Sequence, residues 1–139
     1  NLYTATGSDE NNNSIVLRIL HPRAKFLFCG DIEQAALQDL LRRQPGNLRA
    51  DVLLVPHHGG LLPDLPRMIK AARPRAAVIQ VGTNPFGHPH SFTLETLQQA
   101  GVLTFRNDLH GAVIMNIDSR GLTVETMSGE KRVCSGWES

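Results

Sequence analysis

Long apolar runs are missing from this chain of 139 residues. None approaches the roughly 20 apolar residues that a transmembrane helix needs. The N-terminal stretch NLYTATGSDE has neither the basic start nor the apolar core of a secretory signal. We therefore expect a soluble chain and, because it begins without Met, a piece of a longer protein.

A strong charge of one sign is also missing, since the chain has 14 basic and 13 acidic residues and a formal net charge of +1. Such a balance creates no overall field that would hold nucleic acid or an anionic membrane, so any anion binding must be local. Cysteine is equally scarce. Cys29 in an apolar segment and Cys134 in a polar tail fit neither a disulfide framework nor a thiolate metal site.

The chain does have the size and the 41% hydrophobic content of one compact domain, residues 1–139, with flexible ends expected at 1–10 and 128–139. Short β-rich segments alternate with amphipathic ones, which implies crossover connections and an α/β layer with a strand-rich end. Strands are expected at 14–20 and 25–30 (a hairpin), 50–56, 75–82, 102–108, 111–118 and 121–127, and helices at 31–44, 65–74 and 91–101. Ser91 is the expected N-cap and Gly101 the expected C-cap of the last helix.

Residues able to carry chemistry follow the predicted strands. Asp31 comes directly after FLFCG, where Gly30 lets the backbone turn and a helix N-terminus favours negative charge. The alternative for Asp31 is a simple N-cap. His57 and His58 follow the strand DVLLV. Adjacent side chains on an extended segment face opposite ways, so one histidine can reach a metal while the other packs behind it; the alternative is a surface pair without function.

A third pair, His88 and His90, flanks Pro89 in an extended segment that follows the next buried strand. Two imidazoles held in this way can chelate a metal or clamp a phosphate, although Pro-rich loops before helices are ordinary. The three groups follow separate strands of one predicted sheet, so the fold can bring them together. A divalent ion with oxygen and nitrogen ligands, zinc or manganese, would suit them.

Six segments together resemble a known family. From about Asn11 to Ile117, the chain is similar to the metallo-β-lactamase-like domain at the C-terminal end of the ComEC family of DNA-uptake channel proteins. The pairing of GDIE with VPHHG is specific to this branch of the superfamily. The segments are, in order, NNNSIVLRI, FLFCGDIE, LRADVLLVPHHGG, RPRAAVIQVG, FGHPHS and RNDLHGAVIM.

The resemblance implies a soluble domain of a bacterial inner-membrane protein, on the extracytoplasmic side, that degrades the DNA strand not transported through the channel. Asp31 matches a carboxylate that bridges two metal ions, and one of His57 and His58 matches the last histidine ligand. We assign Asp31 and His58 to the catalytic centre and keep all three as metal ligands. His88 and His90 match a family motif near the site, where they would contact substrate phosphate or support the ligands.

The chain also departs from the family. The main metal motif of the superfamily, His-x-His-x-Asp-His, lies in the N-terminal half of its αββα sandwich and does not occur in this sequence. We therefore expect the second half of the sandwich only, with a mixed sheet and helices packed on one face. The stretch after the paired histidines, GLLPDLPRM, is apolar where the family has phosphate-binding residues. The family's Asp-Gly is His110-Gly111 here, and we expect His110 in a turn.

Two classes of function compete. The first is a part of a metal-dependent nuclease with DNA and the rest of the channel protein as partners. The second is a binding or structural module of the channel without catalysis. With most ligands missing, we expect the isolated chain to bind zinc or manganese weakly or not at all and to be inactive as a nuclease. A half-sandwich leaves a sheet edge uncovered, so we also expect self-association through the hairpin strands.

Overall fold

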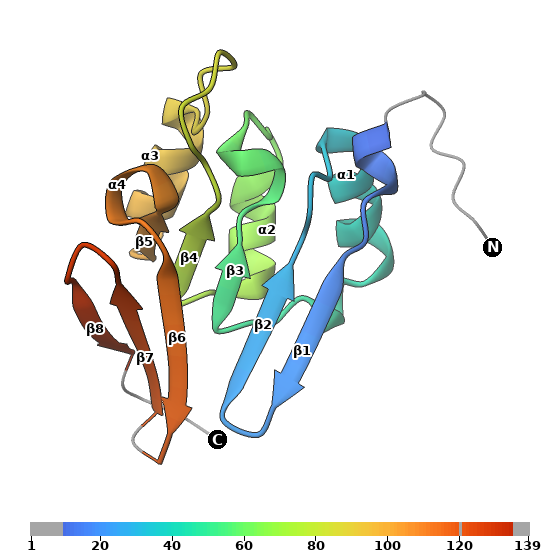
Figure 1. Cartoon of the computed structure of the whole chain (residues 1–139). Coiled ribbons are helices and arrows are strands. Elements are labelled where there is room, and N and C mark those ends of the chain that lie inside the picture. Colours follow the sequence, from blue (N-terminus) through green and yellow to red (C-terminus); the bar gives the residue numbers. More distant parts are fainter. Residues whose placement is uncertain (1–9, 120, 135–139) are drawn as a thin grey trace.

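The computed structural model describes residues 10–119 and 121–134. They form a five-stranded sheet in the order β1-β2-β3-β4-β5 and a three-stranded sheet in the order β6-β7-β8 (Figure 1). The strands are β1 (Leu17–His21), β2 (Ala24–Phe28), β3 (Val52–Leu54), β4 (Ala76–Ile79), β5 (Leu103–Arg106), β6 (Val113–Asp118), β7 (Gly121–Thr126) and β8 (Lys131–Cys134). The helices are α1 (Gln34–Arg43), α2 (Leu65–Ala72), α3 (Ser91–Gln99) and α4 (Asn107–His110), with short 3-10 turns η1 (Glu10–Asn13), η2 (Pro45–Asn47) and η3 (Pro56–Gly59).

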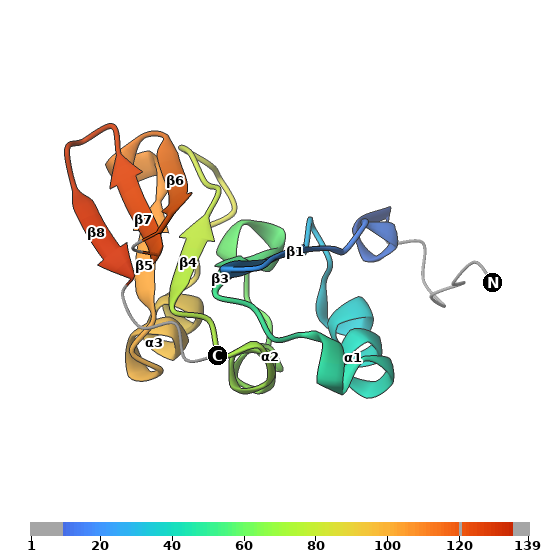
Figure 2. The ribbon, with the colours of Figure 1, turned by 90° about the horizontal axis from the view of Figure 1, so that it is seen from below.

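The connections between the strands explain why the helices form one layer on the large sheet. Strands β1 and β2 form the predicted antiparallel hairpin, and β2, β3, β4 and β5 are parallel neighbours joined through α1, α2 and α3. Each crossover steps to the next strand in the same direction, and crossovers of one hand then place all the helices on one face. Figure 2 shows α1, α2 and α3 on one side of the five-stranded sheet. The predicted α/β fold, with a mixed sheet and helices on one face, is confirmed.

Alternate residues of the central strands enter two separate cores, as the period of two along a strand requires. On β3, Leu53 packs toward the helices in one core while Val52 enters the other. The second core lies between the two sheets, where Phe105 of β5 meets Leu122 and Val124 of β7. The three-stranded sheet therefore covers the face opposite the helices over β4 and β5 (Figure 2).

Strand β1 is the open edge of the large sheet. Leu17 and Ile19 are 50% and 44% exposed, and they lie opposite Phe28 and Phe26 of β2. Phe26 packs partly against the core between the sheets, so these side chains share the face away from the helices. An edge strand with apolar side chains is a template for pairing with another chain.

Some predicted boundaries are wrong. Helix α1 begins at Gln34 with Glu33 as its N-cap residue, so the alternative that Asp31 is an N-cap is wrong. Helix α3 is capped by His90 and not by Ser91, because the His90 side chain accepts the backbone N–H of Phe92. Its C-cap residue is Ala100, and Gly101 follows in the left-handed region with a φ of 68°.

The chain ends differ in part from the expected flexible segments. Lys131–Cys134 form β8 and pair with β7, and Glu10 opens the 3-10 turn η1. Residues 1–9 and 135–139 lie outside the described residues. His110, expected in a turn, is the last residue of the single-turn helix α4. In the described part of the chain, no helix has the length and apolar character to cross a membrane.

Candidate metal centre at the strand ends

The carboxyl ends of β2, β3 and β4 lie at one edge of the sheet, and the predicted site residues follow these strands (Figure 1). A backbone hydrogen bond ties the ends of β2 and β3 together, and a second bond holds the turn after β2 to the segment before β1. The N–H of His57 donates to the carbonyl of Gly30 at 3.0 Å, and the N–H of Asp31 donates to Ser14 Oγ at 3.2 Å. Gly30 has a φ of 54°, a conformation that glycine adopts without strain, and this turn brings Asp31 to the edge.

Asp31 and His58 are brought into direct contact. Nε2 of His58 lies 3.3 Å from Oδ1 of Asp31, and both side chains are about half-exposed. The other ring nitrogen, Nδ1, lies 2.7 Å from the carbonyl oxygen of Gln80. A carbonyl oxygen can only accept, so Nδ1 carries the proton, and in the neutral ring the lone pair is on Nε2, the nitrogen that faces the carboxylate.

His57 makes different contacts. Its Nδ1 lies 3.4 Å from the backbone oxygen of Asp31 and 3.7 Å from Oε1 of Glu33. Oε1 of Glu33 also accepts a hydrogen bond from Asn11 Nδ2 at 2.7 Å. Sequence reasoning missed Glu33, although it closes the GDIE segment that pointed to Asp31.

The paired histidines do not lie on an extended segment, so that expectation is wrong. They occupy the 3-10 turn η3 with φ values of 50° for His57 and 51° for His58, in the left-handed region. The left-handed conformation costs residues other than glycine about 1–2 kcal/mol. Strain of this kind is concentrated at functional sites. The turn nevertheless directs the two rings to different partners.

His88 joins this group through its ring. The ring centroids of His57 and His88 are 5.2 Å apart in an edge-to-face arrangement. Burial holds the pKa of His88 below its usual range, and the nearby His57, His58 and His90 lower it further. A Cβ on Gly60 would lie 2.7 Å from Cδ2 of His57 and 3.0 Å from Cε1 of His88, so the absence of a side chain lets the rings meet.

His90 has structural contacts of its own. Nδ1 of His90 accepts the Phe92 N–H at 3.1 Å, and the His90 N–H donates to the Gly59 carbonyl at 2.9 Å. These bonds fix the start of α3 against η3. Burial raises the pKa of the Cys29 thiol to about 12, which keeps it from acting as a thiolate ligand at neutral pH.

The donor set can be tested against the expected metal. A carboxylate oxygen of Asp31 and a neutral imidazole nitrogen of His58 are donors that suit zinc or manganese. Over residues 10–119 and 121–134, no group of three or more histidine, cysteine, aspartate or glutamate residues is arranged to hold a metal ion. Asp31 and His58 supply two donors, fewer than the three or four protein ligands of a zinc site.

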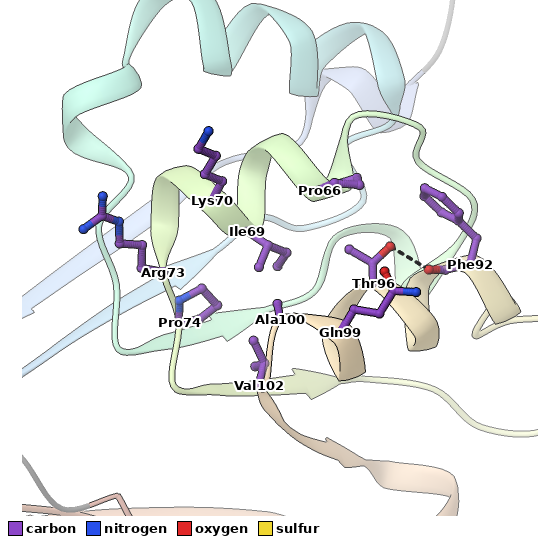
Figure 3. A pocket seen from close by; sticks show the side chains of 10 residues that line it. All are labelled: Pro66, Ile69, Lys70, Arg73, Pro74, Phe92, Thr96, Gln99, Ala100 and Val102. Atoms are coloured by element: carbon purple, nitrogen blue, oxygen red, sulfur yellow. Dashed lines mark hydrogen bonds between the residues drawn. The ribbon is translucent and has the colours of Figure 1, made fainter.

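A separate cavity of about 540 Å³ lies on the helix side of the sheet (Figure 3). Ile69 and Val102 line it from α2 and the start of β5, and Lys70 and Arg73 stand at its rim. Its lining includes none of the histidines or carboxylates at the strand ends. The candidate metal centre therefore lies at the carboxyl ends of the strands and not in this cavity.

Two known proteins are similar in sequence to this chain. The chain is 32% identical over 107 residues to ComE operon protein 3 of Bacillus subtilis (strain 168), covering 76% of this chain and 14% of that protein. The chain is similar to a segment of a competence protein. It is also 28% identical over 120 residues to competence protein ComA of Neisseria gonorrhoeae, covering 86% of this chain and 17% of that protein.

These two similarities support the resemblance to the ComEC family of competence proteins. The chain spans only 14% and 17% of the length of the two relatives. No family model matches the chain.

Proposed function

We propose that this chain is part of a metal-dependent nuclease domain in a competence DNA-uptake protein. The chain is the second half of a metallo-β-lactamase-like αββα sandwich, and it contributes Asp31 and His58 to the metal site. The named competence relatives and the strand-end position of these residues support the proposal.

The contacts of His58 are the main support for this proposal. Nε2 of His58 faces the Asp31 carboxylate at 3.3 Å, while Nδ1 donates to the Gln80 carbonyl at 2.7 Å. Histidines that ligate metals usually donate their other ring N–H to a carbonyl or carboxylate, which fixes the tautomer and the ring orientation. His58 meets this condition next to a carboxylate, and we therefore choose it over His57 as the ligand.

The other side chains support these two. Nδ1 of His57 donates to the backbone oxygen of Asp31 at 3.4 Å and lies 3.7 Å from Oε1 of Glu33, and these contacts hold the turn after β2 beside the turn after β3. His88 packs against His57 and stays neutral at neutral pH, so it can donate or accept a hydrogen bond near a phosphodiester. When bound, a zinc or manganese ion supplies Lewis-acid stabilisation of the charge that develops on the phosphate.

In the parent protein, the remaining ligands come from a His-x-His-x-Asp-His segment that the first half of the sandwich contributes. The partners are then DNA and the membrane channel, with the domain on the extracytoplasmic side of the inner membrane. With only two ligands, this chain alone binds metal weakly and does not cut DNA.

The test uses the longer parent protein, purified with zinc or manganese and given DNA. Asp31→Asn should slow cleavage at least about 100-fold, because it weakens a ligand on which the Lewis acid depends. Asp39→Asn is the matched control, since Asp39 is a carboxylate on α1 that pairs with Arg42 and Arg43. His58→Ala should be far slower than His57→Ala.

The outcomes separate the two functional classes. Full activity of Asp31→Asn removes Asp31 from the reaction. A parent protein that binds DNA but never cuts it, with either metal, favours a binding module of the channel without catalysis.

A further inference from the structure

The loop between β4 and α3 extends beyond the ends of the neighbouring strands (Figure 1). Phe86 in this loop is 76% exposed. It gains little from burial, so the hydrophobic effect within this chain does not explain its presence there. Aromatic side chains are enriched at binding interfaces relative to the rest of a protein surface, so a ring held near a candidate site is suited to contact a ligand.

The loop is nonetheless held in one conformation. Both polar atoms of the Asn84 side-chain amide are used within it. Nδ2 donates to the carbonyls of Gly82 at 2.9 Å and His88 at 2.8 Å, and Oδ1 accepts the N–H groups of Phe86 at 3.1 Å and His88 at 3.0 Å. The backbone of Phe86 is therefore fixed, and its ring is displayed at low cost in conformational entropy on binding.

The ring also belongs to a row of flat side chains that leads to the metal ligands. The centroids of Phe86 and His88 are 5.9 Å apart with the planes tilted by 30°, and His88 meets His57 at 5.2 Å. His57 is followed by His58, which contacts Asp31. A substrate contact at Phe86 would thus be continuous with the proposed reaction site.

We propose that Phe86 stacks on a base of a single DNA strand bound at this site; this inference rests on the proposed function. Every nucleobase has a flat face that an aromatic ring can stack on, so such a contact is independent of sequence. A single strand is required because bases within a duplex are already stacked on each other. With a net charge of only +1, the chain lacks a general field for phosphates, which increases the share of binding that stacking must supply.

The test is binding without cleavage. The anisotropy of a short fluorescent single-stranded oligodeoxynucleotide is measured with the 139-residue chain at low salt in the presence of EDTA. Phe86→Ala and Phe86→Leu should weaken binding roughly 5- to 150-fold, the range expected for one lost base stack, and Phe86→Trp should retain it. Leu109→Ala is the matched control, because Leu109 on α4 is an apolar side chain that is 62% exposed, and its loss should leave binding unchanged.

A second strand of the same length, with abasic sites in place of nucleotides, identifies the contact. It should bind the unaltered chain and Phe86→Ala equally, because neither can stack on a missing base. The inference is overturned if Phe86→Ala binds the normal strand like the unaltered chain, if its defect persists on the abasic strand, or if the unaltered chain binds neither strand. Capture of a protein by Phe86 without any effect on DNA binding would also overturn it.

These outcomes are independent of the proposed nuclease activity. EDTA removes metal from the binding assay, whereas the Asp31 variants are scored by cleavage in the longer protein. Loss of cleavage in Asp31→Asn together with normal DNA binding by Phe86→Ala would leave the proposed function in place and remove this inference.

Discussion

The close approach of two imidazole rings over Gly60 makes a substitution there a direct probe of the site geometry. Gly60 has a φ of −59° and a ψ of 171°, a conformation that alanine adopts without strain. The effect of Gly60→Ala is therefore steric. The new Cβ would lie 2.7 Å from Cδ2 of His57 and 3.0 Å from Cε1 of His88, against the 3.5–4.0 Å that carbon atoms prefer.

The size of the effect follows from two terms. Overpacking of a well-filled site lowers the free energy of unfolding by about 1–3 kcal/mol. Replacing glycine by alanine reduces the entropy of the unfolded chain, which raises the free energy of unfolding by about 0.4–1 kcal/mol. Gly82→Ala isolates the second term, because a Cβ on Gly82 would meet no atom within 4 Å. The free energy of unfolding should therefore be about 1–3 kcal/mol lower for Gly60→Ala than for Gly82→Ala.

Urea unfolding of both variants measures this difference, and NMR spectra of the imidazole groups report where it arises. The signals of His57 and His88 should shift in Gly60→Ala and stay in place in Gly82→Ala. Equal stabilities with unchanged histidine signals would show that the rings do not meet over Gly60, and the described geometry would be refuted.

Three further measurements test other parts of the structure. Thr93 is fully buried and its Oγ1 donates to the Gly60 carbonyl at 2.9 Å, so Thr93→Val should cost about 1–3 kcal/mol in urea unfolding, and a neutral substitution would contradict this bond. The folded chain lowers the pKa of His88, so the unfolded chain binds more protons; the stability that His88 contributes is present above the ordinary value of about 6.5 and is lost as the pH falls through the folded pKa. An NMR titration of His88 in EDTA that gives a pKa at or above that ordinary value would contradict it. Light scattering should show association that grows with concentration and is suppressed by Ile19→Lys on the exposed edge strand, whereas a strictly monomeric unaltered chain would refute self-association through β1.

The sequence was informative where the pattern is local. The hairpin, the buried strands and the crossover helices follow from the spacing of apolar residues, and the parallel order of β2, β3 and β4 then brings Asp31 and His58 to one edge. The roles of these residues stay predictions, because proximity alone does not test metal binding.

The sequence was uninformative where a backbone conformation depends on contacts between distant segments. The left-handed conformation of His57 and His58 is held by bonds to Gly30 and Gln80, which follow other strands, and periodicity carries no signal for it. Glu33 was missed for a similar reason, since its contact with His57 joins two turns that follow different strands. The N-cap residue of α3 is His90 and not the expected Ser91, because an imidazole nitrogen accepts the hydrogen bond that a hydroxyl was expected to accept.

The central claim is that Asp31 and His58 form part of a metal site and that His57 does not. Manganese titration of the chain, followed by NMR, tests it most directly, because a paramagnetic ion broadens nearby signals even when it binds weakly. We expect broadening centred on the turns that hold Asp31 and His58, lost in Asp31→Asn and in His58→Ala and retained in His57→Ala. Broadening that survives both of the first two substitutions, or none at these turns at any manganese concentration, would contradict it.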